Sequence, residues 1–171
     1  MKKQRKFALI IGIVYCFSMV ANAQHQWVFK GETPNGMLYS LSSVNLANMK
    51  VKKSLFYQGR EKGINLGWKG IDDKALSIII AKNDRGEITQ CDNVAIFVVG
   101  GGYLKYESRK NGINLVWSEA PVFEWTITTN NKSCNPIGMN KPYGLFNTKI
   151  NRHLIYGKRD GPVINLDWYY E

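Results

Sequence analysis

The sequence is poor in the residues from which catalytic and metal centres are built. It has 3 cysteines and 2 histidines among 171 residues. It contains neither a Cys-x-x-Cys pair nor two histidines at metal-binding spacing, which argues against a zinc site. No serine or cysteine motif surrounds His25 or His153, and the glycines at 100–102 are not followed by the Lys-Ser/Thr of a phosphate-binding loop. We therefore expect no metal, no cofactor and no enzymatic activity.

Long hydrophobic runs are also missing, apart from residues 7–20, which are too few to span a bilayer comfortably. Four basic residues precede this run, and the small-x-small sequence at 21–23 follows it. The pattern predicts a signal peptide over residues 1–23 and a mature chain that begins at Gln24. A membrane anchor is the alternative. The protein is thus expected to be secreted or periplasmic, without stable membrane insertion after cleavage.

Acidic residues are scarce beside basic ones, at 13 Asp and Glu against 23 Lys and Arg. The leader contains four of the basic residues and none of the acidic ones, so the mature chain has 19 basic residues to 13 acidic and a net charge of +6. This charge permits an anionic glycan or a cell surface as partner. Nucleic acid is disfavoured because the chain is expected to be exported and its charge is modest. Cys16 leaves with the leader, and two remaining cysteines in an exported chain indicate a disulfide.

What the chain does contain is one phrase repeated three times, at residues 55–68, 104–117 and 154–168. Each copy begins with Leu-x-Tyr, passes through Arg and glycine, and ends in Asn-Leu-x-Trp, and the closing tryptophans lie 49 and 51 residues apart. A repeat of this size indicates one supersecondary unit used several times. Apolar and polar residues alternate at both ends of each copy, with turn chemistry between them, so each copy is predicted to be a β-hairpin.

Two further strands accompany each hairpin. Downstream strands are expected at 75–78 and 123–127, and upstream strands at 37–39, 94–97 and 143–146. The chain stops soon after the third hairpin, but residues 26–29 match 124–127 and supply its missing strand. We expect one all-β domain over 24–171, with units at about 36–81, 93–130 and 142–171 plus 26–30. The spacing from Leu38 to Leu55 also predicts an insertion at 42–53 in the first unit.

Twelve strands in three units that are closed by the terminal strands resemble the β-trefoil superfamily, which includes ricin-B-like lectins, fascins and Kunitz-type protease inhibitors. The resemblance rests on repeat number and strand count, since the chain has no Gln-x-Trp of the ricin-B lectins. It implies that the long connections at 82–93 and 129–141 lie at the same end of a barrel. Each contains one mature cysteine, and we therefore predict a disulfide between Cys91 and Cys134.

Repeated side chains have two interpretations, a common core or a repeated ligand site. The tryptophans are predicted to be core residues rather than sugar platforms, with Trp27 and Trp125 joining Trp68, Trp117 and Trp168. The asparagines either bond the neighbouring turn or bind ligand. The basic residues of the turns either form a ring of positive charge at one end of the molecule or are solvated turn charges that Glu61, Glu107 and Asp160 partly neutralise. The ligand-binding candidates are Asn65, Asn114 and Asn165, Arg60, Arg109 and Arg159, and Lys62, Lys110 and Lys158.

These observations favour a secreted, non-enzymatic binding module for a glycan or cell-surface polysaccharide, with anionic glycans bound by the basic tips. The trefoil resemblance also implies a Kunitz-like protease inhibitor, acting through an exposed loop such as 42–53 or 129–141. A structural or adhesive surface protein is a third expectation. The step from fold to lectin is an analogy, because one fold hosts many functions.

Overall fold

The computed structural model describes residues 24–110, 112–131 and 133–170, so the predicted signal peptide at 1–23 lies outside the described residues. The described chain is all-β, as expected, with antiparallel strands and one short 3-10 turn at Pro34–Gly36. The strands are β1 Trp27–Lys30, β2 Ser42–Asn48, β3 Lys53–Tyr57, β4 Leu66–Gly70, β5 Ile78–Ala81, β6 Ala95–Val98, β7 Gly102–Tyr106, β8 Leu115–Ser118, β9 Trp125–Thr128, β10 Pro142–Asn147, β11 Arg152–Tyr156 and β12 Leu166–Tyr169.

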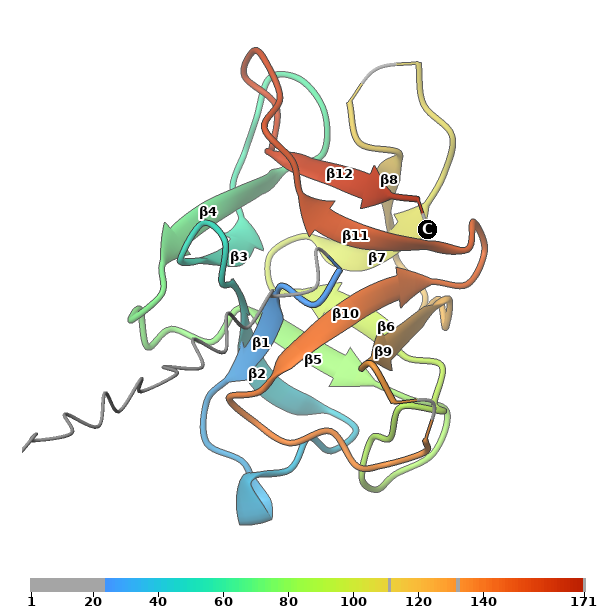
Figure 1. The fold of residues 1–171 in the computed structure, drawn as a ribbon. Helices are drawn as coiled ribbons and strands as arrows, with labels where there is room; N and C mark the ends of the chain where they lie inside the picture. The colour runs from blue at the N-terminus through green and yellow to red at the C-terminus, as the bar shows by residue number, and fades with distance from the viewer. Residues whose placement is uncertain (1–23, 111, 132, 171) are drawn as a thin grey trace, which may run out of the picture.

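Six strands follow one another around a curled sheet, in the order β9, β10, β1, β2, β5, β6. Val94, just before β6, exchanges two backbone hydrogen bonds with Trp125 at the start of β9. This bridge links the two ends of the row. The N-terminal strand β1 lies between β2 and β10, with Trp27 opposite Tyr143 (Figure 1). The predicted pairing of the N-terminal strand with the last third of the chain is therefore confirmed.

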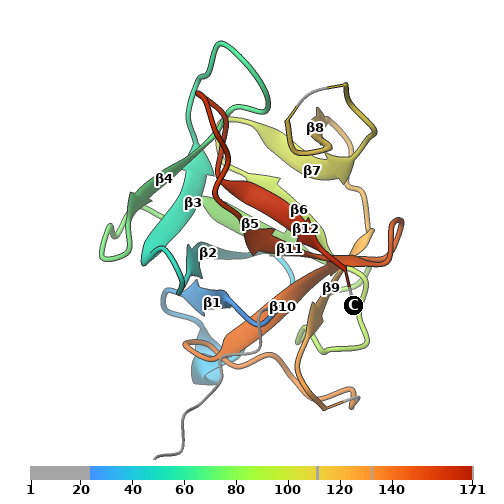
Figure 2. The same ribbon diagram turned by 45° about the horizontal axis from the view of Figure 1, so that its top comes forward.

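The repeated phrase forms three hairpins, β3–β4, β7–β8 and β11–β12, which confirms the hairpin predictions. In each, the leucine of the outgoing strand lies opposite the tryptophan of the return strand, in the pairs Leu55–Trp68, Leu104–Trp117 and Leu154–Trp168. Opposite residues of an antiparallel pair share a face. The tips of all three hairpins lie at the same end of the molecule, at the top of Figures 1 and 2.

A cycle of main-chain hydrogen bonds joins three connecting segments elsewhere in the fold. The N–H of Leu38 donates to Ile137, that of Ile137 to Ile88, and that of Ile88 to Leu38, at 2.8, 2.9 and 2.8 Å. All three side chains are fully buried. Each of the three segments therefore forms backbone hydrogen bonds with the other two and does not extend a hairpin.

This cycle explains why two sequence predictions for the first unit are wrong. Residues 37–39 belong to the cycle, and the strand that precedes the first hairpin is β2. The residue equivalent to Ile96 is consequently Leu46, because Ala47 pairs with β3 as Phe97 pairs with β7. Residues 42–53 are thus no insertion, since most of them form β2, and β2 is buried from Val44 onward. The exposed part of the segment is therefore the turn that follows β2, at 49–52, rather than the whole of 42–53.

The five tryptophans differ in burial more than their repetition predicts. Trp27 and Trp125 are fully buried and Trp168 is nearly so, in agreement with a core role. Trp68 and Trp117 are only partly buried and pack against the core from its edge. The repeat does not fix the burial of the three return-strand tryptophans, because each ring also packs against a tyrosine of a neighbouring hairpin.

The fully buried tryptophans also complete hydrogen bonds that link strands distant in the sequence. The indole N–H of Trp27 donates to the carbonyl of Leu154 at 2.6 Å, and that of Trp125 donates to Leu104 at 2.9 Å. The first unit has Ile78 at this place, and there the hydroxyl of Ser77 donates to the carbonyl of Leu55 at 2.8 Å. In each hairpin, therefore, the carbonyl of the repeated leucine accepts a hydrogen bond from a side chain. The donor is an indole N–H in two hairpins and a serine hydroxyl in the other.

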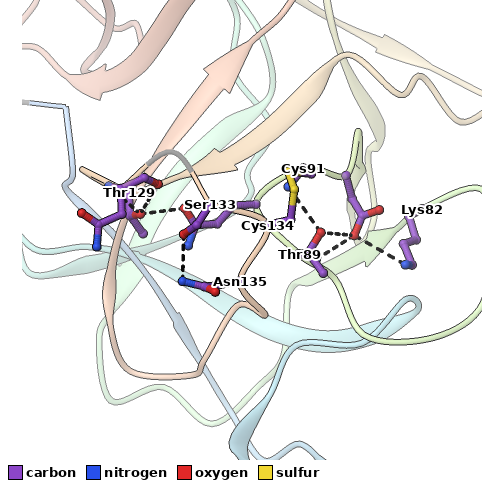
Figure 3. Close-up of a disulfide and its surroundings, with 10 residues drawn as sticks. Lys82, Thr89, Cys91, Thr129, Ser133, Cys134 and Asn135 are labelled. Atoms are coloured by element: carbon purple, nitrogen blue, oxygen red, sulfur yellow. Dashed lines mark hydrogen bonds and ion pairs between the residues drawn. A yellow bond between two sulfur atoms is a disulfide. The ribbon is translucent and has the colours of Figure 1, made fainter.

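The predicted disulfide between Cys91 and Cys134 is present, with Cα atoms 4.9 Å apart (Figure 3). Beside it, Asp92 accepts a hydrogen bond from the N–H of Thr89 at 2.7 Å and lies 3.5 Å from Lys82. Partial burial acts to raise the pKa of Asp92, but the hydrogen bonds from Thr89 and the charge of Lys82 outweigh it and hold this pKa below its ordinary value. The connection 82–93 is thus fixed on both sides of Cys91.

Candidate functional site: a cleft between two hairpins

The repeated asparagines fasten the hairpin turns. In each hairpin the side-chain carbonyl oxygen accepts a hydrogen bond from the backbone N–H of the repeated arginine, at 3.0, 3.0 and 3.1 Å. The pairs are Asn65 with Arg60, Asn114 with Arg109, and Asn165 with Arg159. A bond made three times within single hairpins is a local structural bond. It leaves only the amide nitrogens of these residues for contact with a ligand.

We expect Asn114→Ala to lower the free energy of unfolding by about 1–2 kcal/mol, because the N–H of Arg109 would lose its acceptor. Asn114 does not line the cleft described below, so ligand binding there is expected to persist. Urea unfolding and a binding titration on the same preparation check both points. Unchanged stability would contradict the structural role of this amide.

The repeated arginines do not form a ring of free guanidinium groups. Each folds back to donate to the carbonyl of the leucine that begins the return strand, with Arg60 on Leu66, Arg109 on Leu115 and Arg159 on Leu166. The exposed cations of the tips are the repeated lysines, Lys62, Lys110 and Lys158, and the acids beside them, Glu61, Glu107 and Asp160, are exposed too. The three arginines thus occupy equivalent positions in the sequence, but their guanidinium groups do not keep the same N–H donors for a ligand.

The three guanidinium groups differ in their second partner. Arg60 donates to the carbonyl of Pro162 in the neighbouring hairpin at 3.0 Å. Arg159 forms an ion pair with Asp167 at 2.8 Å. Arg109 has no second partner among the residues that the structure describes, because Val116 stands where the third hairpin has Asp167. Arg109 therefore keeps unused N–H donors.

The hairpin tips approach one another closely. A Cβ atom added to Gly63 would lie 3.8 Å from Val163, and one added to Gly112 would lie 3.9 Å from the Cα of Gly63. Gly63 and Gly112 both have a φ of 84°, a conformation that side-chain-bearing residues rarely adopt. The repeated glycine thus serves both the turn and the contact between tips.

A cleft of about 330 Å³ opens between the first two hairpins. One wall comes from the return side of the β3–β4 hairpin and the other from β7–β8, and the lining residues are Gly63, Ile64, Asn65, Glu107, Arg109, Val116 and Trp117. The cleft thus combines an indole ring and aliphatic carbons with an amide, a carboxylate and a guanidinium group. Pockets for small molecules typically have about this composition, apolar walls with a few placed polar groups.

Trp117 belongs to a set of three aromatic pairs, each between the tyrosine of one hairpin and the tryptophan of another. The ring centroids lie 6.2 Å apart in Tyr57–Trp117, 5.8 Å in Tyr106–Trp168 and 6.1 Å in Tyr156–Trp68. These pairs link the hairpins in a cycle. Contacts at such distances stabilise by about 0.5–1.5 kcal/mol beyond the area they bury.

Fewer large side chains pack on the Tyr57–Trp117 pair than on the other two aromatic pairs. Trp68 stacks on Trp27 and Trp168 stacks on Trp125, at 6.2 and 6.0 Å, whereas the corresponding residue beside Trp117 is Ile78. Lysines lie over the other two tyrosine rings, Lys50 over Tyr156 and Lys149 over Tyr106, each at 5.8 Å.

Glycines occupy the equivalent loop beside Tyr57 and Trp117. A Cβ atom on Gly100 would lie 3.4 Å from the ring of Tyr57, and one on Gly101 would lie 2.7 Å from that of Trp117. No larger residue fits at Gly101 without displacing the indole. This asymmetry between equivalent aromatic pairs could not be read from the repeat, because it depends on residues in other strands.

A larger hollow of about 420 Å³ lies between the end of β1 and the β4–β5 connection, lined in part by Glu32, Asp72, Asp73 and Lys74. Its one buried polar side chain is already engaged, because the amide nitrogen of Asn45 donates to the backbone carbonyl of Asp73 at 2.7 Å and its amide oxygen lies 3.1 Å from the hydroxyl of Ser77. No aromatic ring lines it. Within the described ranges, no group of three or more histidine, cysteine or acidic residues is arranged to hold a metal ion.

Two of the features that make up the candidate cleft were predicted from the sequence, Asn65 and Arg109. The sequence interpretation missed Glu107 and Val116, and it assigned Trp117 to the core. A signal was available for the arginines, since each is followed by the repeated Asn-Leu, with an Arg-to-Asn separation of 5, 5 and 6 residues. Comparison of the chain with protein-family models, with curated proteins and with solved structures finds no match.

Proposed function

We propose that this protein is an exported, non-enzymatic β-trefoil that binds carbohydrate in the cleft between its first two hairpins. Three features support the trefoil interpretation: three hairpins with tips at one end, a cycle of hydrogen bonds among Leu38, Ile88 and Ile137, and a sheet completed by the N-terminal strand. In this interpretation residues 24–171 form one domain with units near 36–81, 93–130 and 142–171 plus 26–30.

Export is supported by the composition of the leader and by the disulfide, since disulfides persist in oxidising compartments. No helix in the described part of the chain is long and apolar enough to cross a bilayer. These observations fit a secreted or periplasmic location, in which extracellular glycans and cell-surface polysaccharides are the available partners.

The observation that supports carbohydrate as ligand is the partly exposed indole of Trp117 beside three polar groups of different kinds. A pyranose ring has an apolar C–H face that can lie on an aromatic ring, and its hydroxyls both donate and accept hydrogen bonds. The carboxylate of Glu107 accepts and Arg109 donates. The amide nitrogen of Asn65 gives one N–H to the hydroxyl of Tyr57 at 3.4 Å and has a second N–H to donate. The cleft is at the small end of the range of about 300–1,000 Å³ for ligand pockets, which suits one or two sugar rings.

A glycan array with the wild-type protein and the Trp117→Ala variant tests this proposal. We expect specific binding by the wild type and a loss of about tenfold or more in affinity for the variant, since one stacked ring contributes an energy of that order. The matched control is Trp68→Ala, because Trp68 is the equivalent tryptophan of the first hairpin and is also partly buried. Trp68 lies between the first and third hairpins, which the Arg60–Pro162 hydrogen bond joins. Equal losses in both variants, or no wild-type binding to any glycan, would contradict the proposal.

One observation favours a protease inhibitor as a second candidate function. The connection at 129–141 has an exposed stretch, and Cys134 and the Thr89–Pro136 bridge both tie it to 82–93. A loop that is already held in one conformation loses less entropy on binding a protease. A panel of trypsin-like and cysteine proteases tests this function, and inhibition that survives Trp117→Ala would assign it to the loop rather than to the cleft.

A further inference from the structure

We propose that the cleft takes a sugar unit that bears an acidic group, one per protein chain, and that Arg109 binds the acid. This inference rests on the proposed function and names its ligand class. The acid can be a carboxylate or a sulfate, because a guanidinium group binds both through paired N–H donors.

The three equivalent arginines differ in the number of hydrogen bonds that they donate. All three bond the leucine carbonyl of their own hairpin, and two then use a second bond, to Pro162 or to Asp167. Arg109 lines the cleft and has no such second bond within the described ranges. The guanidinium group of Arg109 therefore keeps N–H donors for the acidic group of a sugar that stacks on the partly exposed indole of Trp117.

Side chains of the protein fill the equivalent places in the other two hairpins. In the first hairpin the side chain of Gln58 lies over Gly67, close enough to exclude a Cβ atom there. In the third hairpin Asp167 lies over Gly157 and neutralises Arg159. The corresponding pair in the second hairpin is Glu107 with Val116, which leaves the arginine charge uncompensated. Binding is therefore expected at one of the three positions only.

The carboxylate of Glu107 does not cancel this charge. Its Oε2 lies 3.3 Å from the Nζ of Lys105, so it has its own cation. Lys62 and Lys110 are exposed at the two tips beside the cleft. Glu61 is exposed there too, so the charges of Lys62, Lys105, Arg109 and Lys110 against those of Glu61 and Glu107 leave a net +2 around the cleft. A net positive charge raises the local concentration of an anionic ligand and makes its binding sensitive to salt.

The chain offers a substitution that isolates the acid contact. The double variant E107G/V116D copies the Gly157–Asp167 pair of the third hairpin and gives Arg109 an internal carboxylate partner. It keeps the bond from Arg109 to Leu115 and leaves the net charge of the protein unchanged. Glu107→Gly alone is the control for loss of the Glu107 carboxylate. Urea unfolding checks that each variant is folded.

The probes are methyl glucuronide, sulfated glucose and methyl glucoside, titrated calorimetrically at low and moderate salt. We expect one site per chain, acidic probes bound about tenfold or more tighter than the neutral one, and loss of that preference in E107G/V116D but not in Glu107→Gly. The glucuronide and the sulfated sugar distinguish the two acids.

Equal affinity for neutral and acidic probes would overturn the acid assignment while the proposed function stands. Retention of the acid preference in a folded E107G/V116D variant would overturn the role of Arg109. Three sites per chain would overturn the single-site inference. Absence of binding to all three probes and to the glycan array would overturn the proposed function as well.

Discussion

Trp125→Ala is expected to lower the free energy of unfolding by about 3–5 kcal/mol, the range found when a large buried aromatic residue is truncated. Trp125 is fully buried, and its ring stacks on Trp168 at a centroid distance of 6.0 Å. Its indole N–H also satisfies the buried carbonyl of Leu104. The substitution would leave both a cavity and an acceptor without its donor. Guanidinium unfolding followed by circular dichroism measures the change.

Two variants separate these contributions. Trp125→Phe keeps a ring but removes the N–H, and we expect it to cost about 1–3 kcal/mol from the orphaned carbonyl and the smaller ring. Trp125→Ile supplies the side chain that Ile78 has at the equivalent place in the first unit, and it should retain more stability than Trp125→Ala because it leaves a smaller cavity. A Trp125→Ala protein as stable as the wild type would show that this ring is not a core element.

The parts of the fold that could be predicted are those that depend on local pattern. Alternating strands around polar, glycine-containing turns identify the hairpins, because both signals lie within one short segment. The match between residues 26–29 and 124–127 was enough to place β1, since segments with the same sequence pattern occupy equivalent positions in repeated units. Trp27 and Trp125 indeed donate to equivalent carbonyls.

The first unit was misaligned because Leu38 has the same local pattern as a strand residue. What decides its role is a hydrogen bond to Ile137, about a hundred residues away, and no local pattern encodes such a partner. The strand pairings β1–β2, β5–β6 and β9–β10 likewise join different units, so they too depend on partners outside the local pattern.

The candidate cleft could be predicted only in part for the same reason. The presence of Asn65 and Arg109 in turns follows from the repeat, but the state of Arg109 depends on what its equivalents do. Arg60 reaches Pro162 in another hairpin, and Arg159 meets Asp167 across its own. The exposure of Trp117 depends on Ile78 and Gly101, which belong to other strands. Function in a repeated fold is thus best sought where equivalent residues have different partners.

Removal of the Cys91–Cys134 disulfide is expected to lower the free energy of unfolding by about 4 kcal/mol. The bond closes a chain segment with a sequence separation of 43 residues, which contains β6 to β9 and so the whole second hairpin. Restriction of the unfolded chain by a loop of this length gives about that value in the chain-entropy description. The folded chain needs little rearrangement, because the Thr89–Pro136 bridge holds the same two connections together.

Guanidinium unfolding of the oxidised protein, the reduced protein and the Cys91→Ala/Cys134→Ala variant tests this expectation. The reduced protein and the double variant should unfold at similar, lower denaturant concentrations, and reductant should leave the double variant unchanged. Because the effect acts mainly on the unfolded state, the cleft on the far hairpins should keep its affinity for ligand as long as the variant is folded. Equal stability of the oxidised and reduced proteins would mean that the bridge and the surrounding hydrogen bonds already restrict the segment without the covalent bond.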